Sequence, residues 1–161
     1  MHPLSRQAGV TLVEVLLASA LAGFALLALA MLHTQSLRGL DHAQRAVAAN
    51  FLLHDLASRM QANPAGRATY VSLIGGSPAS QGCSSTHSAD AATPCLPAAL
   101  AQHDLYVWKA MATTSLGSLP SAPTLTELSA TDTSYRATLS WKDQDETRSA
   151  SLAFRLRPSI P

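Results

Sequence analysis

The hydrophobic positions of this chain are concentrated in one stretch near the N-terminus. From Gly9 to Leu32 the sequence reads GVTLVEVLLASALAGFALLALAML and contains a single charged residue, Glu14. Between Val15 and Leu32 the one polar side chain is Ser19. A helix of this length and composition can cross a hydrocarbon core of about 30 Å. The pattern therefore predicts a membrane-spanning helix.

The apolar pattern changes after this stretch but does not stop. Residues 33–63 contain no Pro, and apolar side chains recur mostly at steps of three and four: Leu37, Leu40, Ala43, Val47, Phe51, Leu52, Leu56 and Met60. The helix should end at Asn63-Pro64, because the residue before a Pro disfavours helical geometry. We therefore expect one helix over residues 10–63, roughly 80 Å long at 1.5 Å per residue, with an amphipathic second half.

The segment after the long helix is poor in regular patterns. Residues 65–95 are rich in Gly, Ser, Ala and Thr and read mainly as loop, with a short apolar island at 70–74 that we expect to be a strand beside the helix. Leu96 to Leu116 reads as a second helix, since Pro97 suits its first turn and Gly117 marks its exit.

The C-terminal third alternates between apolar and polar positions. Two runs of alternating apolar residues stand on either side of a polar turn: Tyr135, Ala137, Leu139 and Trp141, then Ala150, Leu152, Phe154 and Leu156. This pattern predicts an antiparallel hairpin, with Thr124–Ser129 as a third strand, packed on the long helix. The turn contains Asp143, Asp145 and Glu146, which lack the ligand spacing and Gly of a calcium loop, so we interpret it as a solvated turn.

Composition limits the remaining possibilities. The chain has 161 residues, which leaves about a hundred for one small domain beyond the apolar helix. Lys and Arg number 11 against 10 Asp and Glu, so the near-neutral chain does not favour a nucleic-acid-binding surface. Charged residues are 13% of the chain, which fits a subunit that buries much of its surface against other subunits.

A short basic leader, MHPLSRQAG, precedes the apolar run, with Gly9 directly before it and Glu14 five positions later. This arrangement resembles the type III signal peptide of the type IV pilin family. The resemblance implies that a prepilin peptidase cuts between Gly9 and Val10 and that the new N-terminus, Val10, is N-methylated. It also implies that Glu14 pairs with the amine of a neighbouring subunit, since a buried carboxylate and a buried ammonium each need a fixed partner. The family most often has Phe where Val10 stands.

The leader also sets the topology. Positive charge at Arg6 keeps the N-terminus cytoplasmic, so the rest faces outward. The cut lies before the apolar run, so that run stays in the mature protein. A generic signal anchor with an accidental Glu is the alternative. The predicted organisation is a leader, a transmembrane and assembly half of the helix, an amphipathic half and a globular periplasmic head, at residues 1–9, 10–32, 33–63 and 64–161.

Two cysteines, Cys83 and Cys95, lie in the segment that this topology places outside the cytoplasm, where disulfides persist. We predict that they are bonded, which would contribute about 3 kcal/mol in the chain-entropy model. The rival interpretation is a metal site with His87 and His103, but no Cys-x-x-Cys or His-x-x-x-His spacing supports it.

Two further strings resemble type IV pilus modification proteins, the PilV-type minor pilins. One lies in Ala48–Pro64 and the other in the second helix, and the matching residues are Asp55, Ala57, Arg59, Met60, Ala62 and Asn63, then Asp104, Leu105, Trp108 and Lys109. From spacing alone, Asp55 and Arg59 form an i, i+4 pair on the exposed face of the helix, worth a few tenths of a kcal/mol.

The resemblance implies an α+β, pilin-like fold in which the long N-terminal helix packs under a small antiparallel sheet with a second short helix. It implies a minor pilin that primes pilus assembly at the inner membrane and is located at the pilus tip, with roles in twitching motility or adhesion. Its implied partners are other minor pilins, the major pilin, a prepilin peptidase, the inner-membrane assembly platform and a tip adhesin.

Two other function classes stay open. A type II secretion pseudopilin would share the leader, Glu14 and the long helix, and a membrane-anchored periplasmic enzyme or binding protein is the third class. The chain has no G-x-S-x-G, H-E-x-x-H or phosphate-binding Gly loop, so we expect neither catalysis nor a cofactor or metal.

Overall fold

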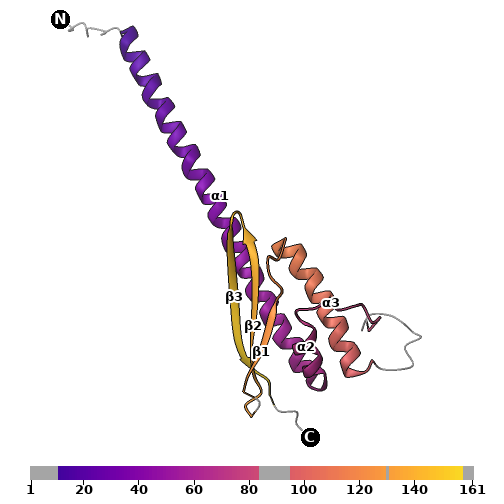
Figure 1. Cartoon of the computed structure of the whole chain (residues 1–161). Coiled ribbons are helices and arrows are strands. Elements are labelled where there is room, and N and C mark those ends of the chain that lie inside the picture. Colours follow the sequence, from indigo (N-terminus) through magenta and orange to yellow (C-terminus); the bar gives the residue numbers. More distant parts are fainter. Residues whose placement is uncertain (1–10, 84–94, 130, 158–161) are drawn as a thin grey trace, which may run out of the picture. The chain divides into compact units, whose positions relative to one another are not determined.

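The computed structural model describes residues 11–83, 95–129 and 131–157. Along the chain it contains a long helix, a short 3-10 turn, two shorter helices and three strands (Figure 1). Their bounds are α1 Leu12–Ala62, η1 Pro64–Gly66, α2 Arg67–Leu73, α3 Pro97–Leu116, β1 Thr124–Ser129, β2 Ser134–Asp143 and β3 Glu146–Arg155. This is an α+β, pilin-like arrangement, which confirms the fold class expected from the sequence.

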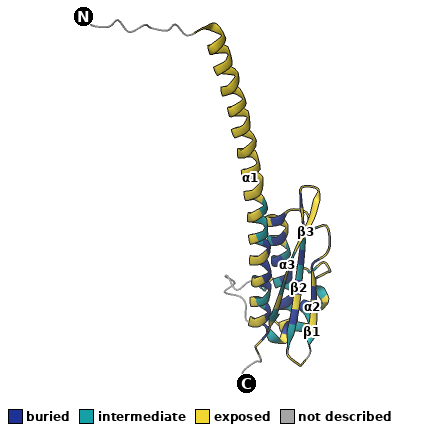
Figure 2. Cartoon of the chain, turned by 90° about the vertical axis from the view of Figure 1, so that its left-hand side faces the viewer, coloured by how far each residue is buried: buried dark blue, intermediate teal, exposed yellow. Residues whose placement is uncertain are grey.

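The chain divides into two compact units between Asp41 and His42. In the first unit the described residues are Thr11–Asp41, and from Leu12 onward they form the first part of α1. Every one of these residues is exposed, as the yellow ribbon of α1 shows in Figure 2. The second unit, which we call the head, begins at His42 and includes the remainder of α1.

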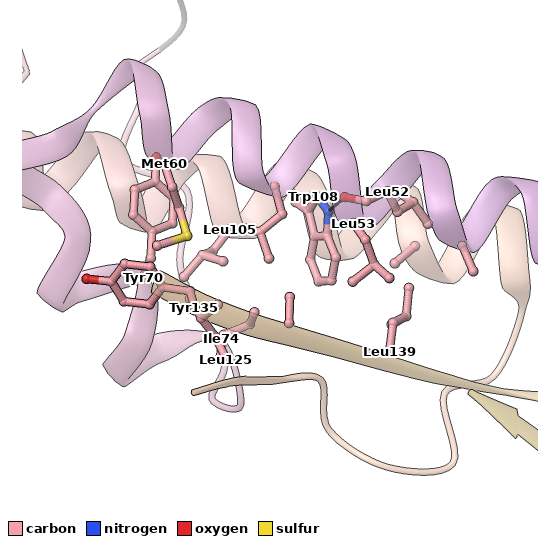
Figure 3. Packing of buried hydrophobic residues seen from close by; sticks show 14 of the residues in the cluster. Leu52, Leu53, Met60, Tyr70, Ile74, Leu105, Trp108, Leu125, Tyr135 and Leu139 are labelled. Carbon is pink, nitrogen blue, oxygen red and sulfur yellow. Dashed lines mark hydrogen bonds between the residues drawn. The ribbon is translucent and has the colours of Figure 1, made fainter. Parts of the chain in front are cut away.

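The head has one hydrophobic core between a layer of helices and a sheet. The second part of α1 and α3 lie on one side of the core and the strands on the other, with side chains meeting between them (Figure 3). Trp108 is the largest fully buried side chain. The helices, with Ile74 directly after α2, contribute Ala49, Leu52, Leu53, Leu56, Met60, Tyr70, Ile74, Ala101, Leu105, Trp108, Ala112 and Leu116, and the C-terminal third contributes Leu125, Tyr135, Ala137, Leu139, Trp141 and Leu156.

The buried face of α1 differs in part from the predicted stripe. Burial of Leu52, Leu56 and Met60 is confirmed, but Val47 and Phe51 are 69% and 67% exposed. The helix carries two overlapping apolar rows at helical spacing, and spacing alone does not say which row the rest of the head covers. The contacts with α3 and the sheet select the row that contains Leu52 and Leu56.

The apolar island at 70–74 is helical, so the expectation of a strand there is wrong. Pro64–Gly66 forms a 3-10 turn, and α2 follows directly as Arg67–Leu73. Tyr70 and Ile74 are four positions apart and both buried, because a helix places i and i+4 on the same face. The amide of Ile74 donates to the carbonyl oxygen of Tyr70 at 3.1 Å.

The sheet has the strand order β1-β2-β3, and both pairs are antiparallel. The predicted hairpin and the third strand are confirmed. Asp143 opposite Glu146 closes the hairpin, with Gln144 and Asp145 as the turn. Gln144 has a φ of +56°, the positive value that the first central residue of a two-residue hairpin turn adopts.

The interpretation of the turn as wholly solvated is wrong for Asp143, which is 1% exposed. Strand β2 buries alternate side chains, and Asp143 falls on the same inward face as Trp141 and Leu139. Its carboxylate is compensated by His42 on α1 and by Arg148, whose Nε lies 3.2 Å from Asp143 Oδ2. Glu146 remains exposed, as expected.

Candidate functional site: the N-terminal segment and the contacts of the head

The predicted cleavage and methylation positions, Gly9 and Val10, lie outside the described residues. The described residues begin at Thr11, directly before the first helical residue, Leu12. The structure therefore shows the N-terminal segment from Thr11 onward, at the start of α1.

Thr11 caps the N-terminus of α1. Its Oγ1 accepts a hydrogen bond from the amide of Glu14 at 3.4 Å, and its carbonyl oxygen accepts from the same amide at 3.0 Å. Glu14 lies in the first turn, where a carboxylate interacts favourably with the partial positive charge of the helix N-terminus. The Thr-x-x-Glu spacing is the sequence signature of a capping box, a local signal for a helix start at this position.

The helix beyond Glu14 exposes apolar side chains all round. The described chain has one helix that is long and apolar enough to cross a membrane, α1, with a mean hydropathy of 2.5 over its most apolar window and none of that window buried. Two of its polar side chains are satisfied within the helix: Ser19 Oγ donates to the carbonyl oxygen of Leu16 at 2.9 Å, and Thr34 Oγ1 to that of Met31 at 2.8 Å. A surface of this kind suits a lipid or protein environment better than water.

In the head, the two strings singled out in the sequence lie against each other. Arg59 Nε lies 2.8 Å from Asp55 Oδ2, and its Nη1 lies 3.0 Å from Asp104 Oδ1 on α3. The Tyr70 hydroxyl donates to the other oxygen of Asp104. These four side chains form what we call the Arg59 clasp, which joins α1, α2 and α3.

The Arg59 clasp changes the interpretation of the pair between Asp55 and Arg59. Asp55 and Arg59 do form an i, i+4 pair, but both are half-buried and the pair extends to Asp104, so it is not an isolated pair on an exposed face. Burial lowers the pKa of Arg59, but hydrogen bonds and charge from Asp55 and Asp104 outweigh this, and the net pKa is raised. Burial, and then the hydrogen bond to Asp104, raise the pKa of Tyr70.

Two further contacts bind the same helices. Trp108 Nε1 donates to the carbonyl oxygen of Leu52 at 2.7 Å, which satisfies the polar end of a buried indole (Figure 3). Asn63 Nδ2 donates to the carbonyl oxygen of Pro97 at 2.8 Å. Gly66 lies against this bond, since a Cβ there would approach Asn63 Nδ2 to 2.5 Å. These contacts fix how α1 and α3 pack in the head.

Cys83 and Cys95 are joined by a disulfide, with their Cα atoms 5.9 Å apart. Of the residues in the rival metal site, His87 lies outside the described residues. Within the described ranges, no group of three or more His, Cys, Asp and Glu side chains could hold a metal ion. The bond closes the segment that leads into α3, so it restrains the entry of the helix that carries Asp104.

The comparison with known families agrees with the N-terminal geometry. A family model described as the prokaryotic N-terminal methylation motif matches residues 4–30, which include Gly9, Val10 and Glu14. No curated protein and no solved structure matches the chain. The match supports a type IV pilin-like or pseudopilin-like subunit that is anchored in a membrane and assembles with other pilins. Proteins with this motif are structural subunits rather than enzymes.

Proposed function

We propose that the chain is a PilV-type minor pilin that joins other minor pilins in the inner membrane, primes pilus assembly and ends at the pilus tip. One observation carries the pilin-type part of this proposal: the prepilin-type motif at residues 4–30 coincides with the start of an exposed apolar helix long enough to span a membrane. In this role the chain is a structural subunit without catalysis, cofactor or metal.

Processing follows from the motif. In this proposal a prepilin peptidase cuts between Gly9 and Val10, and the new amine of Val10 is N-methylated. Glu14 then pairs with the amine of an adjacent subunit. Its exposed place in the first turn of α1 supports this role, because a partner outside the chain can reach the carboxylate there.

The head gives the subunit its specific role. The PilV-type assignment is supported by the two strings that meet in the Arg59 clasp, and a disulfide is consistent with a head outside the cytoplasm. The proposed partners are the other minor pilins, the major pilin, the inner-membrane assembly platform and a tip adhesin. The subunit would begin as a single-pass inner-membrane protein with a periplasmic head and end in the extracellular pilus, supporting twitching motility or adhesion.

A type II secretion pseudopilin fits the N-terminal match equally well, and the two strings are what favour the pilus. The test is a deletion strain assayed for twitching motility and for protein secretion, with the wild-type gene and a Gly9→Ala gene used for complementation. We expect loss of motility with secretion intact, restored by wild type and not by Gly9→Ala. Loss of secretion alone would support the pseudopilin, and a strain normal in both would overturn the proposal.

A further inference from the structure

The two outer strands of the sheet differ in how their free edges are protected. An unpaired strand edge presents a row of N–H and C=O groups that another strand can bind, and proteins usually block it with bulges, Pro, charge or a covering element. Strand β1 has such features: its register shifts between Glu127 and Ser129, Pro123 precedes it, and α2 packs beside it.

Strand β3 carries charged residues near its two ends, Glu146 and Arg148 at one and Arg155 at the other, but its central part lacks these features. In the described part of the chain its one strand neighbour is β2, and the ten pairs from Ser134 opposite Arg155 to Asp143 opposite Glu146 continue without a register shift. The central residues from Ser149 to Phe154 are Ser, Ala, Ser, Leu, Ala and Phe, with no charge and no Pro. Figure 2 shows β3 largely exposed.

The hydrogen-bond pattern identifies which backbone groups face the free edge. Beyond the last strand pair, the amide of Leu156 donates to the carbonyl oxygen of Thr133 at 3.0 Å, so these two residues are a hydrogen-bonded pair. Antiparallel strands alternate hydrogen-bonded and non-bonded pairs. Counting back along β3, the residues whose N–H and C=O point away from β2 are Arg155, Ala153, Ser151, Ser149 and Thr147.

The side chains of β3 also leave room for a neighbour. Ala150, Leu152 and Phe154 point toward the core but are only half-buried, and Phe154 stacks on Tyr135 with ring centroids 6.0 Å apart. They form the partly covered rim of the core, next to the free edge. A strand added there would cover these side chains with its own apolar face and bond to the exposed backbone groups.

We propose that the edge of β3 binds an extended strand from a partner subunit of the same assembly, by β-strand addition. The strand carries apolar side chains on the face that meets Leu152 and Phe154, and small or polar side chains on the other face. This inference rests on the proposed function, because the partner is a pilin-type subunit of that assembly.

The test measures amide hydrogen exchange, residue by residue, on the full-length labelled protein. One sample is the protein alone in detergent, and the other is the protein co-assembled with the pilin-type subunits of its own cell. On assembly, the amides of Ser149, Ser151 and Ala153 should exchange at least about tenfold more slowly. Those of Ala150 and Leu152, already bonded to β2, should change little.

A matched pair of variants gives the second measurement. Ser151→Pro removes an edge-facing N–H, and edge strands tolerate Pro at such positions. Ser151→Thr keeps the N–H. We expect co-purification of the partner subunits to fall roughly tenfold for the Pro variant and to stay near wild type for the Thr variant. A double variant, Ser149→Lys with Ser151→Lys, blocks the edge without changing the backbone, and it replaces Ser151→Pro if that protein melts without a cooperative transition.

The possible outcomes test the edge proposal separately from the proposed function. Normal assembly by both blocking variants, or protection spread evenly along β3, overturns the edge proposal alone. Alternating protection that appears in the isolated protein as its concentration rises shows pairing between copies and overturns the assignment to a partner subunit. Failure of the wild-type chain to assemble with any pilin-type subunit overturns both proposals.

Discussion

Arg59 on α1 and Asp104 on α3 lie 3.0 Å apart, Nη1 to Oδ1, while the same guanidinium holds Asp55 through Nε at 2.8 Å. The two residues are 45 positions apart, and each comes from one of the two strings on which the proposed PilV-type assignment rests. The planar fork of Arg suits this double contact, which the single ammonium of Lys cannot reproduce. The strings are thus the two sides of one helix-to-helix contact.

Replacing Arg59 by Lys should therefore destabilise the head. We expect Arg59→Lys to lower the free energy of unfolding by about 1–2 kcal/mol, because one half-buried carboxylate loses its partner. The control is Arg155→Lys, which alters the exposed pair with Asp132 and should cost less than about 0.5 kcal/mol. Urea unfolding followed by circular dichroism measures both, and equal midpoints for the two variants would contradict this role of the clasp.

Tyr70 makes stability depend on alkaline pH. Its pKa in the folded head is raised above the ordinary value of 10.0, first by burial and then by the hydrogen bond to Asp104. The stabilising contribution is therefore complete below pH 10.0 and is lost as the pH rises above it, because the unfolded chain releases the proton first.

The measurement is the free energy of unfolding from pH 9 upward, for wild type and for Tyr70→Phe. The wild-type curve should fall more steeply, by up to about 1.4 kcal/mol per pH unit. Tyr135, whose pKa burial also raises, stays in both proteins, so the difference between the curves isolates Tyr70. Parallel curves would show that Tyr70 titrates alike in the folded and unfolded chain.

Glu14→Gln should separate membrane insertion from assembly. Insertion should be unharmed or slightly easier, because a carboxylate in a spanning helix costs on the order of 2.5–3.5 kcal/mol. If Glu14 pairs with a neighbour's amine as proposed, assembly should suffer, because that ammonium would lose its counter-charge, a change that typically costs about 3–5 kcal/mol in a low-dielectric core.

Leader removal should continue in Glu14→Gln and stop in Gly9→Ala, and mass spectrometry of the mature N-terminus distinguishes the two. Cross-linking from membranes then measures association with the pilin-type subunits proposed as its partners. If the processed Glu14→Gln protein co-purifies with them at wild-type yield, the carboxylate has another role.

The cysteines should be protected in protein isolated from its native compartment. Cys83 and Cys95 should not react with an alkylating reagent until a reductant is added, since they are bonded to each other. Reduction, or the paired variant Cys83→Ser with Cys95→Ser, should lower the free energy of unfolding by about 3 kcal/mol. Free thiols in the untreated protein, or an unchanged melting temperature after reduction, would argue against a stabilising disulfide.

The features predicted correctly from the sequence are those with a local cause. The apolar run and the following rows of helical spacing predicted α1, which ends at Ala62, one residue before the expected Asn63. Strict alternation on either side of a polar turn predicted β2 and β3, because a strand repeats every two residues. The motif around Gly9 and Glu14 also depends on residues close in sequence, and the family comparison covers it.

The sequence by itself determined the long helix, the second helix over 97–116, the three strands and the position of the prepilin-type motif. Only the tertiary structure decided which apolar row of α1 is buried, leaving Phe51 exposed and Leu53 covered. It also made 70–74 helical, so that Tyr70 reaches Asp104, and it buried Asp143 beside His42, a residue 101 positions away. These outcomes depend on partners distant in the chain, and the spacing of neighbouring residues carries no information about such partners.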